Sequence, residues 1–79
     1  MIIVNQDKDM IINFDNVVKI FVKKYCDDKP EIYCRTIHDI EVFLGEYQTE
    51  ERAKEVLQEI IKLYGADIWT VPVYQMPEE

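Results

Sequence analysis

The segment LGEYQTEERAKEVLQEIIKLYG, residues 44–65, contains one amphipathic helix, and this helix limits the choice of fold more than any other feature. Thr49 is a favourable N-cap, and Glu50 and Glu51 place negative charge at the positive end of the helix dipole. Gly65 suits the position just beyond the last turn. The apolar residues recur at the spacing of one helix face: Ala53, Val56, Leu57, Ile60, Ile61 and Tyr64. The stripe is most simply the face that packs against a sheet.

The other apolar segments are typical of strands. They are separated by polar turns and read MIIV, MIINF, NVVKIFVKK, EIYCRTI, IEVFLGEY and DIWTVPVY. Within NVVKIFVKK, alternation predicts that Val18, Ile20 and Val22 share one face of a strand. Gly45 is expected to mark a bulge, and Pro72 is expected to place the last strand at a sheet edge.

These segments predict an α+β fold. We expect a strongly twisted antiparallel sheet of about five strands with one amphipathic helix packed on one face, in the order β-β-β-β-α-β. Residues 1–79 are expected to form a single small domain, in which 75–79 are a frayed tail. A chain of this length buries a small core, so oligomerisation would be a natural reinforcement.

Charge and hydropathy exclude several classes of protein. The chain has 9 basic and 16 acidic residues and a net charge of −7, which disfavours binding to a nucleic-acid backbone. No apolar run approaches the ~20 residues of a membrane span, and the start MIIVNQDKDM lacks the pattern of a signal peptide. We therefore expect a cytoplasmic protein, with Cys26 and Cys34 as reduced thiols.

No motif indicates catalysis. His38 and Asp39 could belong to a catalytic relay, but the chain has no serine, and neither cysteine lies in a recognisable nucleophile motif. A histidine in a hairpin turn is the simpler interpretation. The cysteine and histidine spacing does not match a zinc site, and the two glycines cannot form a phosphate-binding loop. We expect no enzyme activity, no cofactor and no metal.

Two surfaces are candidates for binding. The first is the acidic face of the helix, where Tyr47 and Trp69 are possible anchors for a protein partner. Its carboxylates are Glu50, Glu51, Glu55 and Glu59. A solvated face is the simpler alternative, since Glu50 with Lys54 and Glu59 with Lys62 have the spacing of helical ion pairs. The leading hypothesis is a non-enzymatic protein-binding module.

The second candidate is a set of cations beside a tyrosine. An oligomer could sequester a nucleotide-like signal at its subunit interfaces, with Tyr33 stacking on the base and cations binding phosphate. These cations are Lys19, Lys23, Lys24 and Arg35. Self-association through the open sheet face or through the edge near Pro72 is a further alternative.

Three stretches resemble a type of small uncharacterised protein encoded by low-GC Gram-positive bacteria, their phages and their mobile elements. The stretches are IINFDNVVKIFV, LGEYQTEERAKEVLQEI and VYQMPEE, and together they cover most of the chain. The resemblance implies a compact sheet-plus-helix unit in a phage or prophage setting, in the cytoplasm of a bacterial host cell. In that setting, small acidic proteins without an active site often act by binding, including as inhibitors of host defence.

Overall fold

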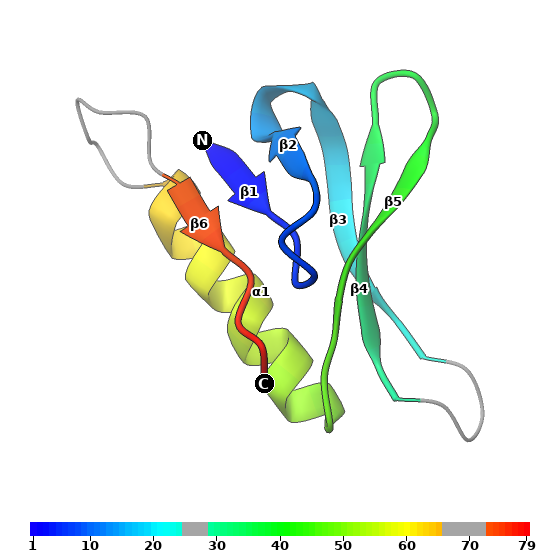
Figure 1. The fold of residues 1–79 in the computed structure, drawn as a ribbon, viewed down its shortest axis with the longest axis vertical. Helices are drawn as coiled ribbons and strands as arrows, with labels where there is room; N and C mark the ends of the chain where they lie inside the picture. Colours follow the sequence, from blue (N-terminus) through cyan, green and yellow to red (C-terminus); the bar gives the residue numbers. More distant parts are fainter. Residues whose placement is uncertain (25–28, 66–72) are drawn as a thin grey trace.

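The computed structural model describes residues 1–24, 29–65 and 73–79, and within them the fold is α+β (Figure 1). Five strands precede the helix: Ile2–Val4 (β1), Ile11–Asn13 (β2), Val17–Lys23 (β3), Glu31–Thr36 (β4) and Glu41–Glu46 (β5). A 3₁₀ turn, Phe14–Asn16 (η1), separates β2 from β3. The helix is Glu50–Tyr64 (α1), and the strand Val73–Gln75 (β6) follows it.

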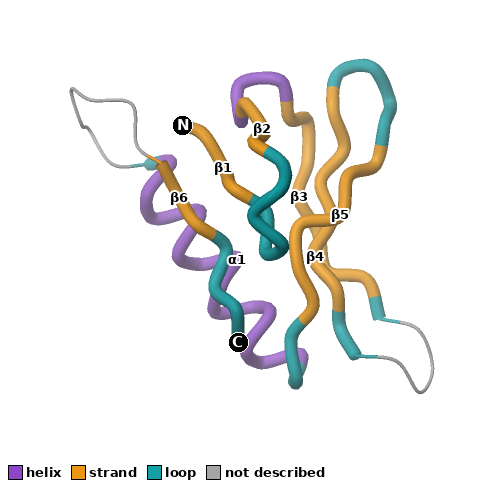
Figure 2. Tube along the Cα trace, in the orientation of Figure 1, coloured by secondary structure: helices purple, strands orange, loops and turns teal. Residues whose placement is uncertain are grey.

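The described strands form two sheets of three, which corrects the expectation of a single sheet of about five strands. The first sheet has the order β2-β1-β6, and the second is the antiparallel meander β3-β4-β5 (Figure 2). In η1 the Asn13 side chain accepts a hydrogen bond from the Asp15 N–H at 3.0 Å. This turn redirects the chain between β2 and β3, so the two strands enter different sheets.

The first sheet is mixed rather than antiparallel. β1 runs antiparallel to β2 but parallel to β6, with Ile3 opposite Ile12 and Tyr74. A parallel pair requires a long crossover, and the segment containing α1 supplies it. Strand β6 lies at the edge of this sheet, as expected for the last strand, although Pro72 itself lies outside the described residues.

The predicted caps of the helix are present. The Thr49 side chain accepts a hydrogen bond from the Arg52 N–H at 3.1 Å, and the Gly65 N–H donates to the Ile61 carbonyl oxygen at 2.9 Å. The buried stripe is narrower than predicted, because Ile61 and Tyr64 are 57% and 61% exposed. Both residues lie near the end of the helix, where Leu63 packs against the core instead.

One core joins the helix to the inner faces of both sheets. Its members are Ile3, Ile12 and Tyr74 of the first sheet, Ile32, Cys34 and Leu44 of the second, and Ala53, Val56 and Ile60 of α1, together with Tyr47 and Met76. In Figure 1, β1 lies between β2 and β6, and α1 also packs directly against β3 of the second sheet. We expected the helix to cover one face of a single sheet. Instead it packs against both sheets.

Two bulges set which side chains face the core. In β3 the register shifts between Val17 and Lys19, so Val18 has no partner of its own on β4. Val18 is 62% exposed, and the prediction that it shares the core face with Ile20 is wrong. In β5 the register shifts next to Gly45, where a bulge was expected. An extra residue in one strand reverses the alternation locally, which explains the exposure of Val18.

The end of the chain packs against the rest of the molecule. Met76 is fully buried, and its N–H donates to the Val4 carbonyl oxygen at 3.0 Å. The Pro77 carbonyl oxygen accepts from the Tyr47 hydroxyl at 2.9 Å and from Gln6 Nε2 at 3.1 Å. Residues 75–79 were expected to be a frayed tail, but these contacts hold them in place. Among the described residues, no helix has the length and apolarity required to cross a lipid bilayer.

Candidate functional site

Three aromatic rings lie side by side on the outer face of the second sheet. Ile32 and Cys34 face the core, so Tyr33 between them points outward. Phe21 and Phe43 are its register partners on the two neighbouring strands. The Phe21 and Tyr33 centroids are 6.1 Å apart with nearly parallel planes, and Tyr33 and Phe43 are 5.6 Å apart edge to face. We call these three partly exposed rings the aromatic ladder.

Lysines from β3 lie over the aromatic ladder. Lys19 Nζ is 4.8 Å from the centroid of Phe21, and Lys23 Nζ is 4.9 Å from the centroid of Tyr33. At such distances an ammonium group is attracted to a ring face, an effect of about 0.5–1 kcal/mol at exposed sites. The lysines therefore hold their charges above the rings rather than away from them.

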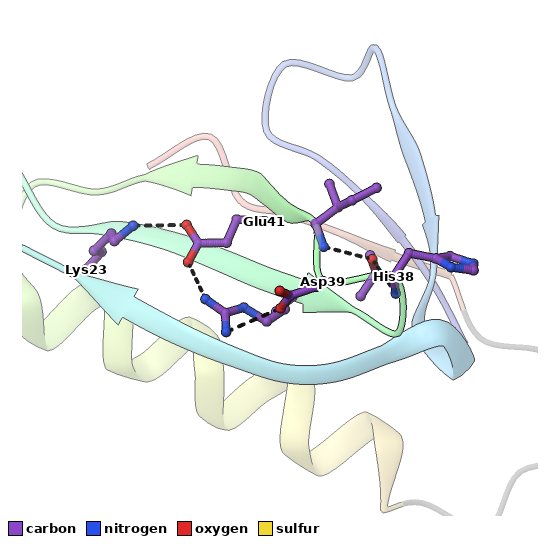
Figure 3. A network of polar contacts seen from close by, with 7 residues as sticks. Lys23, His38, Asp39 and Glu41 are labelled. Carbon is purple, nitrogen blue, oxygen red and sulfur yellow. Dashed lines mark hydrogen bonds and ion pairs between the residues drawn. The ribbon is translucent and has the colours of Figure 1, made fainter.

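A carboxylate from β5 links two of the cations on this face. Glu41 accepts hydrogen bonds from Lys23 Nζ and Arg35 Nη2, each at 3.0 Å, and Arg35 Nη1 lies 3.5 Å from an Asp39 oxygen. Figure 3 shows Lys23 and Glu41 pointing toward each other at one end of this network and Asp39 further along it. The hydrogen bonds from Lys23 and then Arg35 lower the pKa of Glu41. Lys23 and Arg35 thus already have an anionic partner within the chain.

His38 lies in the exposed turn between β4 and β5, which confirms the turn interpretation. Asp39 takes a positive φ of 62°, a conformation that aspartate tolerates in turns. The Thr36 hydroxyl accepts from the backbone N–H groups of His38 and Ile40, at 3.3 and 3.4 Å. Figure 3 includes this turn at one end of the network.

The described residues contain no cluster of three or more metal-binding side chains. Cys34 is buried with a free thiol, and burial raises its pKa. A high thiol pKa reduces the thiolate fraction and hence the nucleophilicity. Cys26 lies outside the described residues, so its position relative to Cys34 is not part of the structure.

The acidic residues of α1 are mostly engaged within the chain. Glu50 lies 3.6 Å from Lys54, as the spacing predicted, and 3.9 Å from Lys24. Glu55 and Glu59 both lie near Arg52 Nη1, at 3.2 and 3.6 Å. Glu51, in the first turn, is exposed.

Glu59 has a second partner that the sequence did not indicate. Its Oε2 accepts a hydrogen bond of 2.6 Å from the Tyr74 hydroxyl, where a pair with Lys62 was expected. Burial and this bond raise the pKa of Tyr74. Glu59 therefore fastens α1 to β6 and is not simply a free acidic group.

Tyr47 is not available as an anchor for a partner, which corrects our expectation. Only 2% of Tyr47 is exposed, because its ring packs over Gly45 and its hydroxyl binds the Pro77 carbonyl. Trp69, the other expected anchor, lies outside the described residues.

Most of the second candidate set lies on one face. Lys19, Lys23, Arg35 and Tyr33 all lie on the outer face of β3-β4-β5. Lys24 lies apart from them, near Glu50 of the helix.

Sequence reasoning missed three members of this face: Phe21, Phe43 and Glu41. A signal was present in the sequence. In NVVKIFVKK and IEVFLGEY both phenylalanines occupy the alternate positions that also carry Lys or Glu, which indicates aromatic side chains on the outer face. Their meeting with Tyr33 depends on strand register, which alternation alone does not supply.

Comparison of the chain with protein families, curated proteins and solved structures gives no match.

Proposed function

We propose that this chain is a non-enzymatic protein-binding module, and that its contact surface is the outer face of the β3-β4-β5 sheet. The observation that supports this most is the aromatic ladder, with Lys19, Arg35 and Glu41 on one side of it. Protein interfaces typically have aromatic anchors in the centre and polar groups at the rim. The ladder has this arrangement.

The acidic face of α1 is a weaker candidate. Glu50, Glu55 and Glu59 each have a cation of the same chain within 4 Å, and Tyr47 is buried. Exposed helical pairs of this kind contribute a few tenths of a kcal/mol and need no partner. The resemblance implies a phage or mobile-element setting. In that setting the module would act by occupying the surface of a host protein, including a defence protein.

The test compares two sets of variants by native mass spectrometry of protein purified gently from its own cells. We expect Tyr33→Ser and Phe43→Ser to lose a retained protein partner that the wild type keeps. The matched control is Glu51→Lys with Glu55→Lys, which alters the helix and should keep the partner. Loss in the helix variant together with retention in the aromatic variants would assign binding to α1 and contradict the proposal.

A second candidate function is sequestration of a nucleotide-like ligand by an oligomer. It is supported by the position of Lys19, Lys23 and Arg35 around Tyr33 on one face. Against it, Glu41 already binds two of these cations and would repel a phosphate. A purified oligomer that releases an ultraviolet-absorbing small molecule on denaturation would favour this candidate, and Glu41→Gln should then tighten its binding.

A further inference from the structure

We propose that the partner seated on this face is a second copy of the chain, packed face to face about a two-fold axis parallel to β4. The inference rests on the proposed function and names the partner of the same surface. It follows from how charge is distributed over the three strands.

The outer face consists of three rows of side chains that run across the strands in the order β3, β4, β5. The central row is the aromatic ladder, Phe21, Tyr33 and Phe43. The row on one side is Lys19, Arg35 and Glu41, and the row on the other side is Lys23, Glu31 and Glu46. In both charged rows the β3 member is a cation and the β5 member is a carboxylate. The face therefore has a basic edge and an acidic edge.

A two-fold axis parallel to β4 places the basic edge of one chain over the acidic edge of the other. Lys19 then faces the partner's Glu41, and Lys23 faces the partner's Glu46. In the central row Phe21 faces the partner's Phe43, and Tyr33 meets its own copy on the axis. On the axis Arg35 and Glu31 also meet their own copies, so two like-charge pairs on β4 stand against four opposite-charge pairs between β3 and β5. Such an isologous contact is therefore complementary in charge along its edges and buries the aromatic ladder of both copies.

The other way of stacking the faces, with the axis perpendicular to the strands, is unfavourable. It would place Lys19 over the partner's Lys23 and Glu41 over the partner's Glu46. Only Arg35 and Glu31 would then face opposite charges, which gives two opposite-charge pairs against four like-charge pairs. Like charges opposed across an interface cost free energy, so the balance of pairs selects the axis along β4. Lys19 supports the same choice, because it makes no ion pair with any of the described residues of its own chain.

The size of the face sets the strength of the contact. Three strands spaced ~4.8 Å apart, with about five residues of ~3.3 Å each, make a surface of roughly 15 Å by 17 Å. This area is below that of a standard stable interface, so we expect a dimer of micromolar or weaker affinity. The net charge of −7 on each copy also opposes association at low ionic strength, and near-physiological salt screens this repulsion.

The test is sedimentation velocity on the full chain, at protein concentrations from about ten micromolar to about one millimolar, a range matched to an interface of this size. We expect a concentration-dependent dimer for the wild type. Lys19→Glu and Glu41→Lys should each shift the dissociation constant upward at least tenfold, because each variant alone opposes like charges at two symmetric positions. An equimolar mixture of the two variants should restore association, since each new charge meets an opposite one.

Matched controls distinguish a loss of dimerisation from a change in net charge and from a loss of folding. Lys54→Glu and Glu51→Lys on the exposed side of α1 change the charge by the same amounts and should leave the dimer unchanged. Thermal unfolding of every variant shows that it is folded. Because Glu41→Lys also breaks the contacts with Lys23 and Arg35, the pair Lys23→Glu and Glu46→Lys provides a second mixing test, in which Arg35 keeps its contact with Glu41.

The outcomes separate this inference from the proposed function. A wild type that stays monomeric up to about one millimolar overturns self-pairing, as does a mixture that fails to associate. If the monomer nevertheless retains another protein that Tyr33→Ser loses, the binding module stands and only its assignment to a second copy fails. A dimer whose dissociation constant is unchanged in Tyr33→Ser, Lys19→Glu and Glu41→Lys uses another surface and overturns self-pairing through this face. The proposed function falls separately, if a retained partner is lost from the helix variant and kept by the aromatic variants.

Discussion

The Tyr47 hydroxyl donates a hydrogen bond of 2.9 Å to the carbonyl oxygen of Pro77, which lies 30 residues further along the chain. The same carbonyl accepts from Gln6 Nε2 at 3.1 Å, and Arg52 Nε donates to the Glu79 carbonyl at 2.9 Å. Side chains from the start of the chain, from the segment after β5 and from α1 therefore converge on the last residues. This convergence makes Tyr47 a stabilising residue rather than a binding one.

Replacing Tyr47 by phenylalanine should lower the free energy of unfolding by about 0.5–1.5 kcal/mol, since one hydrogen bond is lost from a buried hydroxyl. The Gln6 amide still satisfies the Pro77 carbonyl, so the effect should lie at the lower end of that range. Urea unfolding measures the change. Tyr64→Phe is the matched control, because Tyr64 is 61% exposed and should show no effect.

Stability should fall at alkaline pH. Burial raises the pKa of Tyr47 to about 12 from an ordinary value of 10.0, and it also raises the pKa of Tyr74. The unfolded chain loses these protons first, so stability is fully present below pH 10.0 and declines as the pH rises towards the folded values. Unfolding midpoints across this interval should show the decline. Tyr47→Phe should have a shallower slope, and an equal slope would contradict the assignment to Tyr47.

Gly45→Ala should be destabilising by about 1–3 kcal/mol, the range for overpacking a tight site. An added Cβ would lie 3.0 Å from the Tyr47 hydroxyl oxygen and 3.2 Å from Cε2 of the same ring, which is held by Pro77. Gly65→Ala is the control. Its Cβ would meet only the Ile61 carbonyl at 3.4 Å, and its φ of −80° suits alanine. Thermal unfolding of both variants should separate them clearly.

The Glu41 network predicts a measurable pKa. A side-chain NMR titration should place the pKa of Glu41 below 4.5, because hydrogen bonds from Lys23 and Arg35 favour the carboxylate. The stabilisation from this network is present above the unfolded pKa and disappears as the pH falls through the lowered folded value. Lys23→Met should raise the pKa, whereas Lys54→Met should leave it unchanged. An unchanged pKa in Lys23→Met would show that the network does not persist in solution.

The sequence predicted the local elements better than their arrangement. The helix, its Thr49 cap and the bulge beside Gly45 follow from local rules of propensity and turn chemistry. The division into two sheets does not, because it depends on the turn at Phe14–Asn16 and on the pairing of β1 with a strand about seventy residues away. Val18 shows the same limit within one strand. A single extra residue moved it out of the core, and alternation cannot reveal where such a residue is accommodated.

The candidate site could not be fully predicted from the sequence for the same reason, because it is formed by contacts between residues far apart in the chain. Tyr47 looked like an exposed anchor because nothing near it in sequence indicates that residues 75–79 fold back over it. Lys19, Lys23, Arg35 and Tyr33 were candidates for binding a ligand, and their common position on the outer face of the second sheet was not expected. Its central phenylalanines were not, since they become neighbours only once the register is known.

The parallel pairing of β1 with β6 also has a consequence for the order of folding. The β3-β4-β5 meander joins neighbours in sequence, so its strands can pair as soon as they leave the ribosome. β1 is synthesised first, yet it gains its second neighbour only after Val73–Gln75 have been added. Until then Ile3 and Tyr47 lack the residues that cover them, and a nascent chain that stalls before this point exposes an unpaired strand edge.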